Sequence, residues 1–159
     1  MIFTGSAEHA IDEKNRLAIP SKFRNRLDAR RDGNGFYITL GFPRTSLWIY
    51  TERQFEDISE GPGSGLLPES GPLKFDQWFF PLAEYVEVDS QGRMTIPEHL
   101  LKKSKLPREI VICGVRDHME VRPRASDQQE TEEVPDVEAA RAVYGLRAKT
   151  TEGRRDKDL

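Results

Sequence analysis

A block of nine residues occurs twice in this sequence. Asp12–Pro20 (DEKNRLAIP) returns 77 positions later as Asp89–Pro97 (DSQGRMTIP). A unit this short cannot bury a core alone, so we expect the two copies to pack against each other about a pseudo-two-fold axis. The repeat therefore predicts one domain made of two related halves, and it marks the residues that both halves share.

Composition sets the class of protein. The chain has 159 residues, 36% of them hydrophobic and 32% charged, and a mean hydropathy of -0.65, as expected for one soluble domain with a polar extension. Its single cysteine, Cys113, allows no internal disulfide, and Met1–Gly5 has neither the basic nor the apolar segment of a secretory leader. No apolar run approaches the roughly 20 residues that cross a bilayer as a helix. We therefore expect a cytoplasmic protein with no membrane contact.

Charge is distributed unevenly along the chain. The net charge is -3, but residues 125–159 carry nine acidic and six basic side chains, which leaves residues 1–124 with no net charge. Within that body, residues 12–31 carry seven Lys or Arg against three acids, and residues 89–108 carry five against two. Positive charge thus lies at the same place in both repeats, and a two-fold arrangement would bring the two patches onto one face. From charge alone, two solvated helix faces remain the simpler explanation.

Each repeat predicts the same order of elements: strand, tight turn, short strand, short helix and a closing pair of strands. The predicted strands cover residues 9–11, 17–19, 36–40 and 47–50 in the first repeat, and 84–88, 109–114 and 119–121 in the second. Pro20 and Pro97 fit the first turn of each helix, where a missing amide hydrogen costs nothing. In the first helix, Phe23 and Leu27 would face inward. We therefore predict a mainly β fold with short helices, of the α+β class.

The segment between the repeats divides into a helix, a loop and an aromatic stretch. We expect the helix over residues 51–60, with Phe55 and Ile58 facing inward, and the loop over residues 61–65. Residues 73–83 hold four aromatic side chains and predict a helix or turn that packs into the core, with a subunit contact as the alternative. The domain boundaries that follow are 1–60 for the first repeat with its helix, 61–83 for the linker and aromatic segment, 84–124 for the second repeat and 125–159 for an acidic, disordered tail.

The repeated turn carries the most specific chemistry. An aspartate at its start can bond backbone amides two residues further on, and its fourth position holds Asn in one copy and Gly in the other, two residues that tolerate a left-handed backbone. This pattern predicts a positive φ and a sharp reversal that aims the next side chain, which is Arg16 in one copy and Arg93 in the other. Each arginine either pairs with its own aspartate and clamps the loop, or reaches a phosphate or a guanine edge. The turn-shaping residues are Asp12, Asn15, Asp89 and Gly92.

Three motifs together resemble a known family. They are the doubled Asp-x-x-x-Arg followed by Ile-Pro, the Met-Ile-Phe-x-Gly start, and the late Val-Ile-Cys-Gly-Val-x-Asp stretch. They are similar to those of the MraZ family, tandem SpoVT/AbrB-type transcriptional regulators of bacteria, over residues 1 to about 124. The resemblance implies a pseudo-two-fold, swapped-hairpin β-barrel built from both repeats. It also implies a homo-oligomeric ring at the nucleoid that binds double-stranded DNA at direct repeats in the promoter of its own division and cell-wall gene cluster.

The same resemblance assigns candidate DNA-binding residues. The paired turns of this family bear the DNA-facing surface, and the matching positions here are Lys14, Arg16, Gln91 and Arg93. Three basic residues of the first helix would make secondary contacts to the DNA backbone: Lys22, Arg24 and Arg26. Asn15 stands where the family usually has Gly, and Gln91 replaces a basic residue. We therefore expect the two turns to contribute unequally.

An enzymatic function is not expected. The three histidines, His9, His99 and His118, lie far apart without the spacing of metal ligands, and one cysteine cannot form a paired-cysteine site. Cys113 lies among apolar residues and predicts a small buried group. The glycine-rich stretch 61–65 lacks the lysine of a phosphate-binding loop. We predict no metal, no cofactor and no small-molecule substrate.

The tail offers the main alternative function. Some SpoVT/AbrB relatives are antitoxins whose C-terminal tails wrap a toxin, so a protein-binding module is the competing hypothesis. Here residues 126–138 contain six acids and no base, and residues 137–149 are compatible with a helix that has few apolar anchors. An acidic tail could also cover the basic turns, and deleting residues 125–159 would then raise DNA affinity at low salt. Of the two functions, the sequence favours the DNA-binding regulator.

Overall fold

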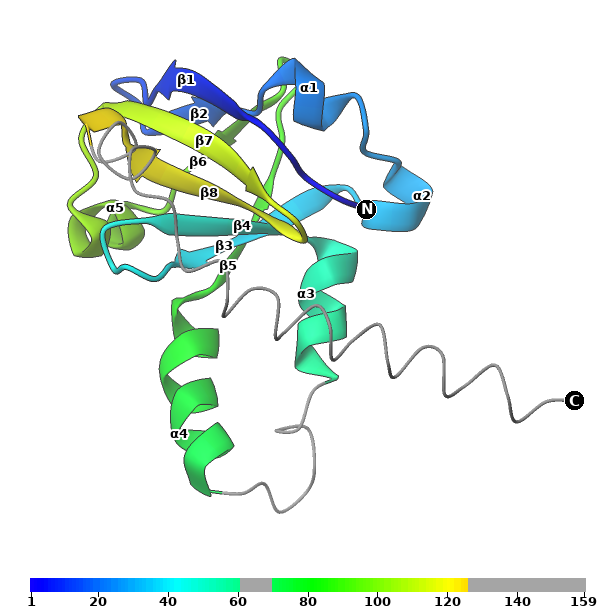
Figure 1. The fold of residues 1–159 in the computed structure, drawn as a ribbon, viewed down its shortest axis with the longest axis vertical. Helices are drawn as coiled ribbons and strands as arrows, with labels where there is room; N and C mark the ends of the chain where they lie inside the picture. The colour runs from blue at the N-terminus through cyan, green and yellow to red at the C-terminus, as the bar shows by residue number, and fades with distance from the viewer. Residues whose placement is uncertain (61–69, 126–159) are drawn as a thin grey trace, which may run out of the picture. The chain divides into compact units, whose positions relative to one another are not determined.

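A computed structural model describes residues 1–60 and 70–125 of the chain (Figure 1). The predicted loop at 61–65, the helix predicted over 137–149 and nearly all of the acidic tail lie outside the described residues.

Short helices and strands alternate in both halves. The first half contains β1 (Ser6–Ala10), β2 (Arg16–Ala18), α1 (Ser21–Arg24), α2 (Ala29–Asp32), β3 (Gly35–Leu40) and β4 (Leu47–Thr51). The second half contains β5 (Glu84–Glu87), β6 (Arg93–Thr95), α5 (Glu98–Ser104), β7 (Glu109–Val115) and β8 (His118–Pro123). Between them lie α3 (Glu52–Ser59), α4 (Ser70–Phe79) and one 3₁₀ turn (Phe80–Leu82). The prediction of a mainly β fold with short helices is confirmed.

Local sequence accounts for the helix boundaries, with two differences from the prediction. Helix α3 starts with a capping box, in which the Thr51 hydroxyl accepts from the Gln54 amide and the Gln54 side chain accepts from the Thr51 amide, both at 3.2 Å. Pro20 and Pro97 each stand one position before their helix, not in its first turn. Helix α2 was not predicted; it begins where the Asp28 carboxylate accepts from the Arg30 amide at 2.8 Å.

The strands form a six-stranded antiparallel sheet in the order β1-β7-β8-β4-β3-β5 and a separate ladder of β2 with β6. The two repeats exchange their first strands. His9 of β1 lies opposite Ile110 of β7, and Val86 of β5 lies opposite Phe36 of β3. Since β1 and β5 form opposite edges, the described strands make an open sheet and a ladder, and the closed barrel implied by the resemblance is not formed by strand pairing.

The ladder of β2 with β6 has the register of a two-fold axis. Leu17 lies opposite Met94, Arg16 lies opposite Thr95, and Ala18 lies opposite Arg93. Each residue of one repeat is therefore paired with the same position of the other repeat as its equivalent 77 positions away. Two matching backbone bonds extend the pattern, from the Ile19 amide to the Gly92 carbonyl at 2.9 Å and from the Ile96 amide to the Asn15 carbonyl at 2.8 Å.

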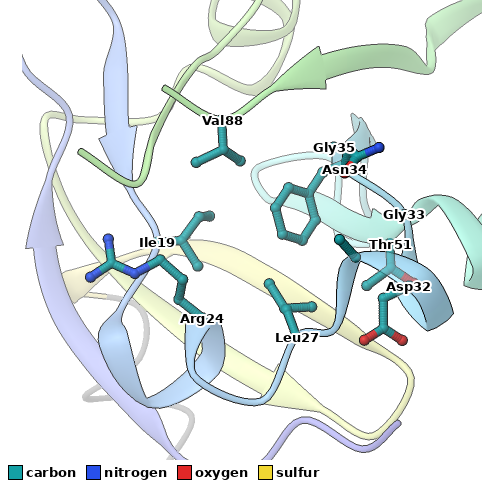
Figure 2. A pocket seen from close by; sticks show the side chains of 11 residues that line it. Ile19, Arg24, Leu27, Asp32, Gly33, Asn34, Gly35, Thr51 and Val88 are labelled. Atoms are coloured by element: carbon teal, nitrogen blue, oxygen red, sulfur yellow. The ribbon is translucent and has the colours of Figure 1, made fainter. Parts of the chain in front are cut away.

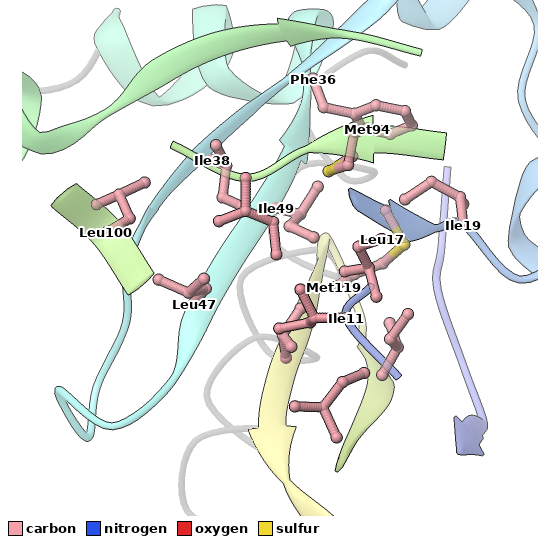
Figure 3. Close-up of a cluster of buried hydrophobic side chains, with 14 of the residues drawn as sticks. Ile11, Leu17, Ile19, Phe36, Ile38, Leu47, Ile49, Met94, Leu100 and Met119 are labelled. Atoms are coloured by element: carbon pink, nitrogen blue, oxygen red, sulfur yellow. The ribbon is translucent and has the colours of Figure 1, made fainter. Parts of the chain in front are cut away.

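One core lies between the sheet and the ladder, and both repeats contribute to it (Figure 3). Leu17 and Met94 enter it from the ladder, and Ile38 and Ile49 enter it from the sheet, all four fully buried. Burial of an apolar side chain of this size contributes about 1.5–3 kcal/mol. Cys113 is buried as predicted. In residues 1–60 and 70–125, no helix combines the length and the apolar character needed to cross a membrane.

The aromatic stretch packs partly as predicted. Phe79 is buried with Phe55 and Tyr50 in a second apolar cluster, so core packing is confirmed for this residue. Phe75, by contrast, is 47% exposed, although its ring lies 5.3 Å from that of Phe79. Ile58, predicted to face inward, is 38% exposed because helix α3 covers the cluster with Phe55 alone among its apolar residues.

Candidate nucleic-acid interface

The first turn is organised by the carboxylate of Asp12. One oxygen accepts hydrogen bonds from the backbone amides of Lys14 and Arg16, at 2.9 and 2.8 Å. The other accepts from Arg16 Nε at 2.7 Å. Asn15 has a φ of 61°, in the left-handed region that the sequence predicts. The turn thus reverses sharply and delivers Arg16 to the start of β2.

The second turn repeats this geometry. Asp89 accepts from the amides of Gln91 and Arg93 at 2.9 and 3.0 Å, and from Arg93 Nε at 2.9 Å. Gly92 takes the left-handed position with a φ of 76°. The two copies therefore share the hydrogen bonds and backbone geometry of the turn as well as its sequence pattern.

Both aspartates are held ionised. The backbone amide of Arg16 is the main cause that keeps the pKa of Asp12 below its ordinary value, and the guanidinium of Arg16 lowers it further. The backbone amide of Arg93 acts in the same way on the pKa of Asp89, again with help from the guanidinium. A carboxylate that accepts several hydrogen bonds is stabilised in its charged form. The ion pair between the aspartate and the arginine, called the clamp below, is therefore kept in each turn at neutral pH.

The clamp leaves each arginine accessible. The side chains of Arg16 and Arg93 are 30% and 28% exposed, so neither is sealed inside the protein. Only Nε of each is used by its aspartate, and the Nη atoms donate no hydrogen bond to residues within the described ranges. Of the two roles that the sequence left open, the ion pair is present in both turns, and it does not occupy the outer donors of the guanidinium.

The two arginines lie on the same face of the ladder. Because side chains alternate along a strand, Arg16 and Arg93 point to the side opposite the buried Leu17 and Met94. They occupy diagonal positions across the pair, where Cα atoms are about 7–8 Å apart. Thr95, on the same side, is exposed. The repeated arginines thus form one outward-facing pair.

The remaining predicted DNA-binding residues differ in whether they have a partner within the protein. Lys14 and Gln91 are exposed at the tips of the two turns. The three basic residues of the first helical segment are also exposed, but each tip donates to a backbone carbonyl: Lys22 to Ser6, Arg24 to Gln91 at 3.2 Å and Arg26 to Ile2 at 3.3 Å. Lys22 also lies 5.2 Å from the centre of the Phe23 ring. These three side chains therefore have protein partners that the sequence did not indicate.

One residue at the first turn was missed by sequence reasoning. Arg108 Nη1 donates to the Asp12 carbonyl at 2.7 Å and to Asn15 Oδ1 at 3.0 Å. In the sequence, Arg108 stands out only as one of the five basic residues of the run 89–108. Its 93-residue separation from Asn15 explains why no local pattern pointed to the contact.

The other candidate features in the described part of the chain are metal-ligand groups and cavities outside the two turns. Within it, no group of three or more His, Cys, Asp or Glu could hold a metal ion. A cavity of about 230 Å³ beside α1 and α2 is lined largely by apolar residues, among them Ile19, Leu27 and Val88 (Figure 2). Asp32 also borders it, but its carboxylate is already bonded to Arg31 and the Asp28 amide.

Comparison with known proteins identifies a family whose matched segments contain both turns. The family model of the MraZ protein, described as antitoxin-like, matches residues 2–62 and 79–142. The chain belongs to the MraZ family. Its relative "Transcriptional regulator MraZ" from Mycoplasma mobile is 39% identical over 117 residues, which are 74% of this chain and 76% of that protein. The two matched segments of the MraZ model contain both Asp-x-x-x-Arg turns, and the gap between them falls on the linker and most of α4. The resemblance drawn from the sequence is therefore confirmed.

Proposed function

We propose that this chain is a transcriptional regulator that binds double-stranded DNA through the face carrying Arg16 and Arg93. The observation that carries the proposal is the outward-facing arginine pair, held by Nε and with its outer donors unused by the described residues. The name of the Mycoplasma relative supports it, since that protein is a transcriptional regulator of the same family.

The clamp explains how an arginine in an ion pair can still read DNA. Nε of the guanidinium is bound by the aspartate, which leaves the Nη donors for a phosphate or for O6 and N7 of guanine. A good bidentate contact of this kind is worth about 1–3 kcal/mol of discrimination against a wrong base. The aspartate fixes the plane of the guanidinium before DNA arrives, so less rotational freedom is lost on binding.

The surrounding residues have graded roles in this proposal. Base pairs are about 3.4 Å apart along the axis, so the diagonal arginine pair spans about two steps. Lys14 would contact a phosphate, and Gln91 would contact a base edge or phosphate in the second turn. Lys22, Arg24 and Arg26 would add phosphate contacts only by leaving their carbonyl partners. We therefore expect the turns to dominate affinity.

We further propose that several copies form a ring, which acts at the nucleoid on direct repeats in the promoter of its own division and cell-wall gene cluster. One arginine pair covers a short site, and linking copies raises the effective concentration of each further contact. An exposed aromatic surface supports assembly: Phe42 is 48% exposed and Phe75 is 47% exposed, and their rings lie 6.4 Å apart. Exposed apolar patches of this kind mark protein contacts.

DNA affinity measured against salt tests the proposal. The probe is the duplex upstream of the protein's own gene, with the native chain, Arg16→Ala and Arg93→Ala. We expect each variant to lose about five- to 150-fold in affinity, the loss expected from a bidentate contact, and the salt slope to fall where a phosphate contact is lost. Arg53→Ala is the matched control, because Arg53 also pairs with an aspartate four positions away, Asp57, but lies on α3 and not in either turn. Full affinity in both turn variants, with unchanged melting, would contradict the proposal.

The antitoxin-like description of the family favours one further candidate, a protein-binding module that uses residues 125–159. In that case deleting the tail removes capture of a protein partner and leaves DNA binding by the turns intact.

A further inference from the structure

We propose that Arg108 is a positioning residue that holds the first turn to the second repeat, an arrangement called the lock below, and that Asn15, at the position where the second turn has Gly92, is the residue that receives it. This inference rests on the proposed DNA-binding role of the turn, and it concerns how Arg16 is held and not what Arg16 contacts.

The contacts around Arg108 are all directed at one turn. Its Nη1 donates both to the Asp12 carbonyl at 2.7 Å and to Asn15 Oδ1 at 3.0 Å. Its own carbonyl accepts from the Ile11 amide at 2.9 Å. Backbone and side chain of Arg108 thus contact three of the residues from Ile11 to Asn15. Arginine suits this place because its planar, always charged group loses little freedom in making two bonds from a fixed position.

Asn15 has two properties that the contact requires. Its φ of 61° is unfavourable for most side chains, although asparagine tolerates it better than most. Glycine would satisfy the backbone at no steric cost, as Gly92 does in the second turn. Glycine, however, has no side-chain acceptor for Arg108. Asparagine is the residue that combines a left-handed backbone with an amide oxygen, and the structure places that oxygen on Arg108.

The second turn is braced by a different arginine and needs a different residue. Arg24 of the first repeat donates to the Gln91 carbonyl at 3.2 Å. A Cβ added at Gly92 would lie 1.7 Å from Arg24 Nη1, so the glycine makes room for this side chain. Each turn is therefore held by an arginine of the other repeat, but only the first turn is held through its own side chain. This accounts for the unequal residues at the fourth position.

The lock has a consequence for DNA binding. Arg16 follows Asn15 directly, and the Asp12 carboxylate accepts hydrogen bonds from both the Arg16 amide and Arg16 Nε. Arg108 fixes the Asp12 carbonyl and the Asn15 side chain. The Asp12 carboxylate in turn fixes the plane of the Arg16 guanidinium. Without Arg108, the turn keeps its sequence but loses both side-chain hydrogen bonds that join it to the second repeat within the described residues.

Arg108 is exposed, so a direct phosphate contact is the rival explanation of any effect on DNA binding. Lysine separates the two. Arg108→Lys keeps the positive charge and therefore a phosphate contact, but its single ammonium does not reproduce the geometry of the guanidinium. A positioning role predicts that Arg108→Lys is nearly as damaging as Arg108→Ala. A phosphate role predicts that Arg108→Lys restores affinity and the salt slope, of which one phosphate contact supplies about 0.9.

A double-mutant cycle on the full chain gives the decisive measurement. Asn15→Gly, Arg108→Ala and the double variant are titrated with the duplex upstream of the gene. We expect each single change to weaken binding roughly three- to tenfold, and the double change to be no worse than the weaker-binding single variant, because both remove the same contact. The proposal would be overturned if the double variant lost the product of the two single-variant losses in affinity, or if Arg108→Ala kept full affinity.

Amide hydrogen exchange tests the lock without DNA. Arg108→Ala should speed exchange at the Asn15 and Arg16 amides and leave Gly92 and Arg93 protected. Asn15→Asp, which keeps an acceptor for Arg108, should preserve protection of the first turn. If the native chain binds no DNA, the proposed function fails while the exchange result still decides the lock. Equal exchange in native and Arg108→Ala chains would refute the lock, and equal melting temperatures would show that both are folded.

Discussion

Leu17 and Met94 lie directly opposite each other in the ladder of β2 with β6, and neither side chain is exposed to solvent. They are equivalent residues of the two repeats, so the pseudo-two-fold axis that the sequence predicts relates one to the other. Arg16 and Arg93, one position before them in each strand, consequently point away from the core. The buried pair thus determines which way the arginines face.

Removing either member of this buried pair should destabilise the whole domain. We expect Leu17→Ala and Met94→Ala each to lower the free energy of unfolding by about 2–5 kcal/mol, because a cavity remains where both repeats meet. Urea unfolding followed by circular dichroism measures the loss. Ile58→Ala, at a position 38% exposed, serves as control and should change stability by about 0.5 kcal/mol or less. A comparable loss in the control would show that burial at the ladder is not special.

Gly92 gives a second prediction, which separates backbone strain from crowding. Gly92→Ala should lower the free energy of unfolding by about 1–3 kcal/mol, because alanine is strained at a φ of 76°. Gly92→Asn adds the same Cβ near Arg24 but tolerates the left-handed backbone, as Asn15 does in the first turn. Denaturant unfolding should therefore rank Asn above Ala. The opposite rank would mean that contact with Arg24, and not φ, requires the glycine.

The sequence predicted the features that depend on neighbouring residues. The Asp-x-x-x-Arg turn closes through bonds between residues two to four apart, so the composition of the turn determines its geometry. Its duplication predicted one domain made of two halves. The strand β5 followed from the alternation of residues 84–88. For such elements the local pattern and the observed structure agree because the decisive contacts are local.

Contacts between distant residues were not predictable. Arg108 reaches the first turn across 93 positions, and β1 pairs with β7 of the other repeat instead of with its own hairpin. The ring of His118 lies beside the rings of Trp48 and Tyr50 on β4, which are far from it in the sequence. The family resemblance implied the exchange of strands between the repeats, but neither it nor any local pattern gave the register that brings Arg108 to Asn15 and the β4 rings to His118.

The exposed aromatic surface gives a third prediction. Phe75→Ser should reduce assembly of the protein, measured as mass by light scattering or sedimentation, while the melting temperature changes little because Phe75 is 47% exposed. Phe79→Ala is the contrasting variant: its ring is buried, so it should cost about 3–5 kcal/mol of stability. Unchanged mass for Phe75→Ser would remove this surface from the proposed ring.

A buried charged group on β8 connects stability to pH. His118 Nε2 lies 3.0 Å from Glu120 Oε1, and Nδ1 lies 2.9 Å from Asp117 Oδ1. Arg122 Nη2 lies 2.6 Å from the second carboxylate oxygen of Glu120. Burial by itself lowers the pKa of His118, but the hydrogen bonds to Glu120 and Asp117 outweigh it, and the pKa is raised. Burial raises the pKa of Glu120, but His118 and Arg122 outweigh it, and the pKa is lowered.

Stability should therefore decline as the solution becomes alkaline. A histidine with a raised pKa stabilises the fold fully below its unfolded value of about 6.5, and this contribution is lost as pH rises through the folded value. The contribution of Glu120 is present above about pH 4.3 and is lost as pH falls through its lowered pKa. We expect the free energy of unfolding to fall as pH rises above about 6.5, and His118→Gln to flatten that decline. Urea titrations at several pH values measure both slopes, and equal slopes in the two proteins would exclude His118 as the group responsible.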